Sequence, residues 1–289
     1  MTYAKDYSTS EFMAVIVSRQ IQNDDVTFIG VGIPLLAGIL AVATHAPDCT
    51  LVYEGGGIGA RTRRLPWTIS DNPTTDNALA AAQMWRVFSD QQAGYISLGI
   101  IGGAEIDPYG NLNTTVILSE NHTYDRPMVR LPGSGGANDI ASSAGRTVIM
   151  MRLQKGKFVK KLHYITSPGY LSGPGARERA GLHGTGPKLV VTEKCVFGFD
   201  PQTKEMYLQS LLPGFTVQDI QDLVGWDLKV APNLAELELP TEEQIQILRA
   251  YDPMGFVLGT KGSAGKEDFD HFCARVKQGY EAIPLDLGD

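Results

Sequence analysis

The strongest restriction on how this chain can fold comes from a β-prone run that stops on an acid. Residues 50–53 read TLVY, Glu54 follows, and glycines occupy positions 55–57. A strand of this kind presents its final carboxylate at the carboxyl edge of a sheet, where ligands bind in open α/β sheets. Glycine permits backbone angles closed to other residues and leaves room for a ligand beside the main chain. Glu54 is therefore either a nucleophile or a solvated acid in a glycine turn.

The residues before Glu54 follow a strand–helix–strand pattern. Residues 26–31 are β-prone, residues 35–44 are almost wholly apolar, and Pro34 suits the first position of the helix between them. Such a unit predicts parallel strands joined by a right-handed crossover. Gly30 and Gly32 resemble the start of a dinucleotide-binding motif, but Leu35 stands where its third glycine would be, so we do not expect that cofactor.

Later segments extend the same α/β pattern. Buried strands are expected at residues 95–101, 147–151, 188–192 and 196–199, with residues 163–166 continuing the sheet. Asp76 is expected to cap a helix that runs to about residue 88, with Leu79, Met84 and Val87 in the core. The chain is thus predicted to be α/β: a single domain over residues 1–258 with a mainly parallel central sheet flanked by helices. Residues 259–289 are expected to form a linker and a helical tail.

Composition excludes several classes of function. The chain has 289 residues and a net charge of −7, which disfavours nucleic acid as a partner. Its three cysteines, Cys49, Cys195 and Cys273, are widely spaced, so neither a disulfide framework nor a metal site is expected. The longest apolar run, at residues 33–43, is too short to span a membrane. The N-terminus is polar and lacks a signal peptide pattern, and the expected setting is the cytoplasm.

Two charged groups and one glycine-rich run are further candidates for a site. Arg61 and Arg64, with Arg63, could bind a carboxylate or phosphate, or form a solvated cluster. Glu105 follows a Gly-Gly turn and is either a base or a surface acid. The run PGSGGAN at residues 132–138 opens a predicted helix with free amides. It is either a nest for an anion or oxyanion or a simple connector.

Taken together, these stretches resemble the B (beta) chain type of the family I CoA-transferases, and glutaconate CoA-transferase most closely. The matching pieces are VYEGG at residues 52–56, IGGAEIDPYGNLN at 101–113, PGSGGAN at 132–138, and ITSPG through GPGARER at 165–179. The resemblance covers roughly residues 8–255, in the family's order. It implies the fold shared by NagB, RpiA and the CoA-transferases.

The resemblance also implies a reaction and a partner. Glu54 would attack an acyl-CoA thioester and pass through a glutamyl-CoA thioester, with ping-pong kinetics. The amides of Gly135, Gly136 and Ala137 would serve as oxyanion donors, with Asn138 beside them, and Gly55, Arg61, Arg64 and Glu105 would contact substrate. Acyl-CoA and a free carboxylic acid, such as the short dicarboxylate glutaconate, would be the substrates, with no tightly bound cofactor. An A (alpha) subunit would complete a hetero-oligomer, expected to be A2B2.

This chain departs from the family's pattern where substrate identity would be decided. Gly55 stands where the glutaconate enzyme has serine, and the segment from Glu54 to Ile101 is shorter. Two alternatives stay open: an acyl-CoA hydrolase or lyase on the same scaffold, using Glu54 or Glu105 as base, and a non-catalytic subunit that binds acyl-CoA.

Overall fold

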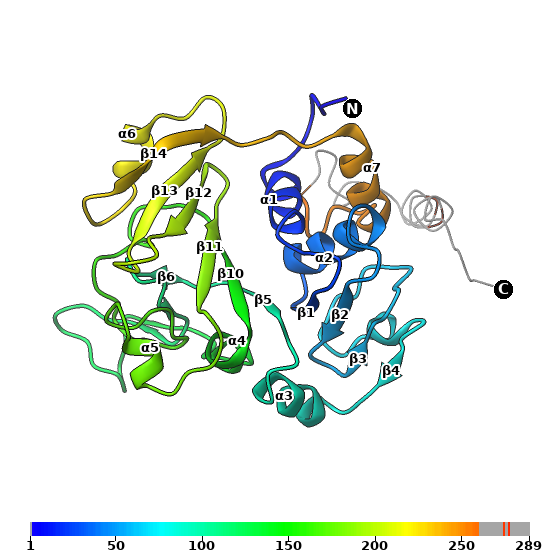
Figure 1. Ribbon diagram of the computed structural model, residues 1–289, viewed down its shortest axis with the longest axis horizontal. Helices are drawn as coiled ribbons and strands as arrows, with labels where there is room; N and C mark the ends of the chain where they lie inside the picture. Colours follow the sequence, from blue (N-terminus) through cyan, green and yellow to red (C-terminus); the bar gives the residue numbers. More distant parts are fainter. Residues whose placement is uncertain (1, 260–273, 275–276, 278–289) are drawn as a thin grey trace. The chain divides into compact units, whose positions relative to one another are not determined.

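The computed structural model describes residues 2–259, 274 and 277. The chain divides into two compact units (Figure 1). The first comprises residues 1–87 and those from 239 onward, and the second comprises residues 88–238. Each unit contains its own strands and helices and is described separately. The predicted linker and tail at residues 259–289 lie almost wholly outside the described residues, so the boundary at residue 258 stays a prediction.

The first unit is built on the predicted strand–helix–strand motif. Strand β1 (Val26–Ile29) pairs in parallel with β2 (Thr50–Tyr53), and helix α2 (Ile33–Ala43) connects them. Two short strands, β3 (Gly57–Ile58) and β4 (Ala80–Ala81), then add antiparallel pairs beyond β2. The turn between β2 and β3 therefore carries Glu54 at the carboxyl end of a parallel strand, as predicted.

Three helices pack together in this unit. Helices α1 (Thr9–Ser18) and α7 (Glu242–Tyr251) both contact α2, although they lie far apart in the sequence (Figure 1). Glu11 closes the capping box of α1 and accepts a hydrogen bond from Arg249 Nε of α7 at 2.6 Å. The Glu11 side chain is fully buried, so this ion pair fixes the contact between α1 and α7.

The prediction for residues 76–88 was wrong. Residues Asn72–Thr75 form a 3₁₀ turn that closes at Asp76, and helix α3 spans Met84–Gln92. Asp71 caps that turn, and β4 pairs with β3, so the residues expected to begin the helix are used elsewhere. Leu79 is 81% exposed and Met84 40% exposed, whereas Val87 is buried as expected.

The second unit contains a mixed sheet whose central strands are largely buried and whose edge strand β14 is mostly exposed. Its strands, in hydrogen-bonded order, are β14 (Lys229–Glu236), β13 (Met206–Leu211), β12 (Cys195–Phe199), β11 (Pro187–Val191), β10 (Arg146–Met150) and β5 (Leu98–Ile101). The pairs β5–β10, β10–β11 and β13–β14 are parallel, and the two pairs made by β12 are antiparallel. The apolar sequences of the central strands fit strands covered on both faces.

Shorter elements surround this sheet. They are the hairpin of β6 (Glu105–Ile106) and β7 (Leu112–Asn113), the hairpin of β8 (Val116–Ile117) and β9 (Val129–Arg130), and helices α4 (Ala137–Ser143), α5 (Ala176–Arg179) and α6 (Val217–Gln221). Helix α4 packs on β5 and β10. The prediction that residues 163–166 continue the sheet was wrong, because these residues are irregular. Isolated β-bridges lie on either side of them, from Phe158 to Ile106 and Val224 and from Ser167 to Leu112.

A buried arginine holds the long loop at residues 167–175. Arg177 is 3% exposed, and its guanidinium donates to the carbonyl oxygens of Ala141, Gly169 and His183. Burial lowers the pKa of this guanidinium. Because carbonyl oxygens surround it, Arg177 links the end of α4 to the loop rather than offering a cation to a ligand.

Two expectations concern membranes and metals. None of the helices in the described part of the chain is long and apolar enough to cross a membrane. Within those same residues, no group of three or more His, Cys, Asp or Glu is arranged to hold a metal ion. Cys49 and Cys195 are buried free thiols, and Cys273 lies outside the described residues.

Candidate active site

Glu54 lies in the turn that follows β2 and is half-buried. The turn is closed by the Gly56 amide, which donates to the Tyr53 carbonyl oxygen at 2.9 Å. Burial raises the pKa of the Glu54 carboxyl group. Partial desolvation strengthens a carboxylate nucleophile, because fewer water molecules must be removed before it can attack.

The three glycines after Glu54 allow other parts of the same unit to pack closely on the turn. A β-carbon on Gly55 would lie 2.1 Å from the Ile69 carbonyl oxygen, and one on Gly57 would lie 1.7 Å from that of Thr74. Gly56 has φ +120° and faces the carbonyl oxygen of Ala82. The sequence analysis expected these glycines to leave room for a ligand. At all three positions, residues 69–82 occupy that space instead. Contact of Gly55 with substrate stays a prediction.

Tyr53 is buried directly before Glu54. In the described part of the chain its hydroxyl group has no hydrogen-bond partner. Burial is the main cause that raises its pKa, and the nearby Arg61 partly opposes it. Tyr53 therefore remains a neutral phenol beside the turn.

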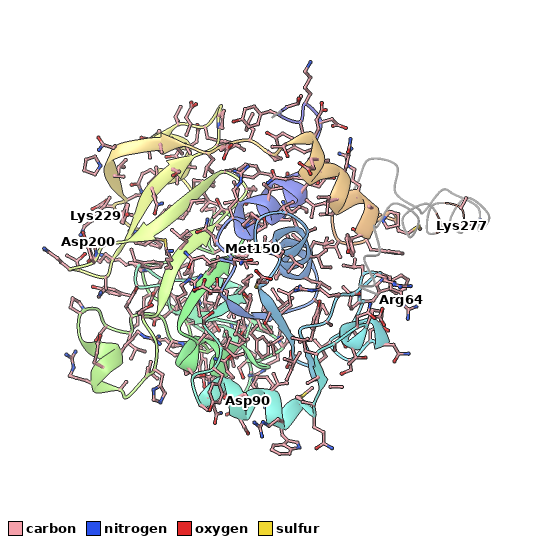
Figure 2. The ribbon with its side chains drawn as sticks, turned by 45° about the vertical axis from the view of Figure 1, so that its right-hand side comes forward. Arg64, Asp90, Met150, Asp200, Lys229 and Lys277 are labelled. Atoms are coloured by element: carbon pink, nitrogen blue, oxygen red, sulfur yellow. The ribbon has the colours of Figure 1, made fainter. Side chains whose placement is uncertain are left out.

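In the predicted arginine cluster, Arg61 and Arg64 are exposed and Arg63 is half-buried. Arg61 donates to the carbonyl oxygens of Pro47 at 2.6 Å and Cys49 at 3.4 Å, which supports the entry to β2. Arg64 is exposed (Figure 2). Substrate contact by either arginine stays a prediction.

The predicted anion nest lies in the second unit. Gly135 has φ +48°, and Gly136 is the N-cap of α4 with helical angles, so the two have the left-handed and right-handed geometry of a nest. The Ala137 amide donates to Ser134 at 3.0 Å and is already used. Among the residues described, the amides of Gly135 and Gly136 donate to no acceptor. These two are the better candidates for oxyanion donors.

Glu105 also belongs to the second unit, where it is 2% exposed. Its Oε2 accepts from Asn113 Nδ2 at 2.6 Å, and its Oε1 contacts His163 Nδ1 at 2.7 Å. Both carboxyl oxygens are therefore engaged by protein groups. The sequence analysis missed His163, because nothing in its local sequence indicates a partner 58 residues away.

Asn113 connects Glu105 to the glycine nest. Its Oδ1 accepts from the amides of Thr115 and Val116 at 2.9 and 3.3 Å. The next two residues bind the segment before the nest through their carbonyl oxygens. The Gly133 amide donates a hydrogen bond to the Thr114 carbonyl oxygen at 2.8 Å, and the Leu131 amide donates one to that of Thr115 at 3.0 Å. An asparagine followed by two threonines is a local sign of such a turn, but the sequence analysis did not use it.

The predicted site residues fall into two groups. Glu54, Gly55, Arg61 and Arg64 belong to the first unit, and Glu105, Gly135, Gly136, Ala137 and Asn138 belong to the second. Within the second unit, hydrogen bonds and the peptide groups of the Asn113 turn join Glu105 to Gly133, which precedes the nest. The Asn138 carbonyl oxygen accepts from the Ser142 hydroxyl group at 2.7 Å, one turn further along α4.

Comparison with known proteins defines the class to which this arrangement belongs. Residues 10–223 match the family model described as coenzyme A transferase. The chain therefore belongs to the coenzyme A transferase family, which confirms the predicted resemblance and enzyme class.

Individual relatives show which subunits and which solved structure this chain is similar to. The chain is 38% identical to the B-type subunit of 3-oxoadipate CoA-transferase from Pseudomonas knackmussii, over 85% of this chain and 94% of the relative. It is also 38% identical to the B-type subunit of glutaconate CoA-transferase from Acidaminococcus fermentans, over 84% and 92%. The crystal structure of glutaconate CoA-transferase from A. fermentans matches with a TM-score of 0.81 and 36% identity, covering 90% of this chain and 100% of that one. One solved chain thus spans both units and confirms the predicted α/β fold class, with its mainly parallel mixed sheet and flanking helices.

Proposed function

We propose that this chain is the B-type subunit of a heteromeric enzyme that transfers CoA from an acyl-CoA to a free carboxylic acid. The observation that carries the proposal is a half-buried carboxylate, Glu54, held at the carboxyl end of a parallel strand with its pKa raised by burial. Family membership supports CoA as the transferred group. The two relatives that are 38% identical are named for glutaconate and 3-oxoadipate, which supports a short dicarboxylate as the acyl group.

The reaction follows from a carboxylate nucleophile. Glu54 attacks the thioester carbonyl carbon, the C–S bond breaks, and CoA leaves as a thiolate, so an acyl-glutamyl anhydride forms. The thiolate then attacks the Glu54 carbonyl carbon and releases the donor acid, which leaves a glutamyl-CoA thioester. The acceptor carboxylate attacks the glutamyl carbonyl carbon of that thioester, the C–S bond breaks, and CoA leaves as a thiolate, so a second mixed anhydride forms. The thiolate then attacks the acceptor's acyl carbon, which yields the new acyl-CoA and releases Glu54 as the carboxylate. Each step exchanges activated acyl bonds, so the activation is retained if water is excluded.

The amides of Gly135 and Gly136 are our candidates for stabilising the oxyanion in these steps. Preorganised amides aimed at developing negative charge are worth roughly 3 kcal/mol per donor in enzymes that form such intermediates. An A-type partner subunit completes the enzyme in this proposal, since relatives are named as B or beta subunits, and A2B2 is the expected stoichiometry. The cytoplasmic setting stays a prediction.

Trapping the intermediate tests the proposal. The chain, co-purified with its partner subunit, is incubated with glutaconyl-CoA or 3-oxoadipyl-CoA and treated with borohydride or hydroxylamine, and peptides are read by mass spectrometry. We expect modification at Glu54, and loss of transfer by roughly a thousandfold or more in Glu54→Gln. The control Glu243→Gln removes an exposed carboxylate on α7 and should leave activity unchanged.

The same assay separates the alternatives. Release of free CoA without transfer to the acceptor acid would indicate a hydrolase, and a changed acyl group that is still attached to CoA would indicate a lyase. Saturable binding of acyl-CoA without turnover would indicate a non-catalytic subunit. Full transfer activity in Glu54→Gln, with no modified peptide, would refute the covalent mechanism.

A further inference from the structure

His163 is an exposed imidazole held in place by a buried carboxylate. Its Nδ1 lies 2.7 Å from Glu105 Oε1, while its side chain is 36% exposed and that of Glu105 only 3%. Its backbone amide also points to Glu105 Oε2 at 3.5 Å. Among the described residues, Nε2 has no partner. A ring fixed through one nitrogen presents the other to solvent in a defined direction, as a carboxylate does for the histidines of many metal sites.

Four lysines lie in residues 155–161, shortly before His163. Lys155, Lys160 and Lys161 are exposed and Lys157 is half-buried. In the described part of the chain, none of their side chains forms an ion pair or hydrogen bond, whereas lysines 194 and 229 each pair with a glutamate. The whole chain carries a net charge of −7, so acids are in excess. A lysine group left without acids in such a chain is suited to an anionic ligand.

The segment that carries these charges is firmly anchored. Phe158 is buried and packs against Phe197 and Trp226, with ring centroids 5.4 and 6.4 Å away. Its neighbours pair with Ile106 on one side, and its carbonyl oxygen accepts from Gly225 on the other. The basic groups thus project from a fixed backbone, which lowers the entropy cost of binding.

Aromatic side chains lie beside this segment. Tyr164 follows His163 directly and contacts Tyr124, with ring centroids 5.9 Å apart. Both rings are about half exposed, and Arg130 lies over the Tyr124 ring at 4.7 Å. Exposed rings next to cations recognise the flat base of a nucleotide, because stacking accepts any π-face.

We propose that Lys160, Lys161 and His163 bind the phosphate groups of the 3′-phospho-ADP end of coenzyme A, and that Tyr164 and Tyr124 stack with its adenine. Glu105 acts in this site as a positioning residue for His163. The inference rests on the proposed function, which supplies CoA as the ligand. It assigns a role to Glu105 that needs no direct contact with substrate, in agreement with its burial.

Truncated substrates test the site. The enzyme with its partner subunit is assayed with an acyl-CoA, the acyl-3′-dephospho-CoA and the acyl-pantetheine. In Lys160→Gln/Lys161→Gln, kcat/KM for the acyl-CoA should fall by about tenfold or more, the loss expected for charge-assisted phosphate contacts, while that for acyl-pantetheine changes less than about twofold. Glu105→Gln should lower kcat/KM for the acyl-CoA relative to kcat/KM for the acyl-pantetheine by about threefold or more, because the imidazole loses its anionic partner.

Two controls keep the test decisive. Lys188→Gln removes an exposed lysine of the same unit and should leave the ratio of acyl-CoA to acyl-pantetheine unchanged. A variant that is merely less folded lowers both rates equally and leaves the ratio unchanged. Calorimetry with 3′,5′-ADP should show binding to the wild-type complex and binding weaker by about tenfold or more to Lys160→Gln/Lys161→Gln.

The outcomes separate this site from the proposed function. Equal losses on acyl-CoA and acyl-pantetheine, or unchanged 3′,5′-ADP affinity in the double variant, would overturn the site while transfer itself stands. Binding of 3′,5′-ADP that depends on these lysines, in a complex that transfers no CoA, would support the site and refute the transferase reaction. Stronger binding of inorganic phosphate than of 3′,5′-ADP would overturn the nucleotide assignment.

Discussion

The carbonyl oxygen of Ile69 lies 2.1 Å from the position that a β-carbon on Gly55 would take. Gly55 is next to Glu54, so the backbone at residues 69–70 packs directly on the turn that presents the proposed nucleophile. No side chain fits between them unless residues 69–70 move. The serine that the family resemblance leads one to expect at this position would meet the same oxygen.

Gly55→Ala should therefore displace the turn that carries Glu54. We expect kcat to fall by about tenfold or more, since misplacement by about 1 Å can cost a hundredfold in rate. Stability should also fall, by about 1–3 kcal/mol, as for other overpacked sites. The measurements are steady-state kinetics and urea unfolding of the co-purified enzyme. Gly30→Ala is the matched control, because among the described residues no atom beyond its two chain neighbours lies within 4 Å of the added β-carbon. Wild-type kinetics in Gly55→Ala would contradict the close packing.

The raised pKa of Glu54 predicts the acid side of the pH profile. Only the carboxylate is nucleophilic, so kcat/KM should fall with falling pH through an apparent pKa above the usual value for a glutamate side chain. The raised pKa affects folding stability with the opposite dependence on pH. A carboxyl group with a raised pKa in the folded state contributes most below its unfolded pKa and loses that contribution as pH rises through the folded pKa.

Glu54→Gln should consequently gain stability relative to wild type as the pH rises. The difference in melting temperature between the variant and wild type should be more positive at about pH 8 than at about pH 4. Differential scanning calorimetry at both pH values measures it. A difference that shrinks with rising pH would show that Glu54 is stabilised as the anion in the folded protein.

Local chemistry was sufficient to predict elements whose limits depend on residues close in sequence. Pro34 lies in the first turn of α2 as expected, because its fixed φ angle and missing amide hydrogen suit the start of a helix. The helix predicted at residues 76–88 was wrong for the opposite reason. Strand β4 is defined by its pairing with β3, which a local helix pattern cannot reveal. Leu79 was assigned to the core on helical periodicity and lies exposed.

The candidate site shows the same division. Glu54 could be located because an acid followed by glycines has a local meaning at the end of a strand. The role of His163 could not, since it depends on contact with a buried acid from a distant hairpin. Glycine could be recognised at positions 55–57, but the three carbonyl oxygens that require it come from residues 69–82.

Replacing Arg249 with an uncharged residue should clearly lower the stability of the protein, because Arg249 pairs with the buried Glu11. Among the described residues, Arg249→Met leaves a fully buried carboxylate with hydrogen bonds only from its own capping box. Breaking a buried pair costs about 3–5 kcal/mol, and the partial exposure of Arg249 reduces our expectation to about 2 kcal/mol. Urea unfolding measures the loss. Arg249→Lys, which retains the charge, should lose less, and equal losses would show that packing of the side chain, not its charge, stabilises the contact.

Asn113 should matter to both stability and the chemical step. It is fully buried, and Asn113→Ala would leave the amides of Thr115 and Val116 and one oxygen of Glu105 without their partner, at a cost of about 2–4 kcal/mol. The freed turn also holds Gly133, which precedes the nest that we propose as the oxyanion site. In that proposed mechanism the nest should be less well placed, and formation of the Glu54 adduct in a single turnover should slow.

A buried pair in the same hairpin provides the control for Asn113→Ala. Asp107 accepts from Asn111 Nδ2 at 2.8 Å, and Asn111 in turn holds the amides of Gly169 and Leu171 rather than the chain before the nest. Asn111→Ala should thus cost similar stability, because it exposes an equivalent set of unsatisfied groups. It should slow adduct formation much less, measured by rapid-quench single turnover at a temperature where both variants are folded. Equal slowing in the two variants would mean that general loosening of the hairpin, and not placement of the nest, limits the chemical step.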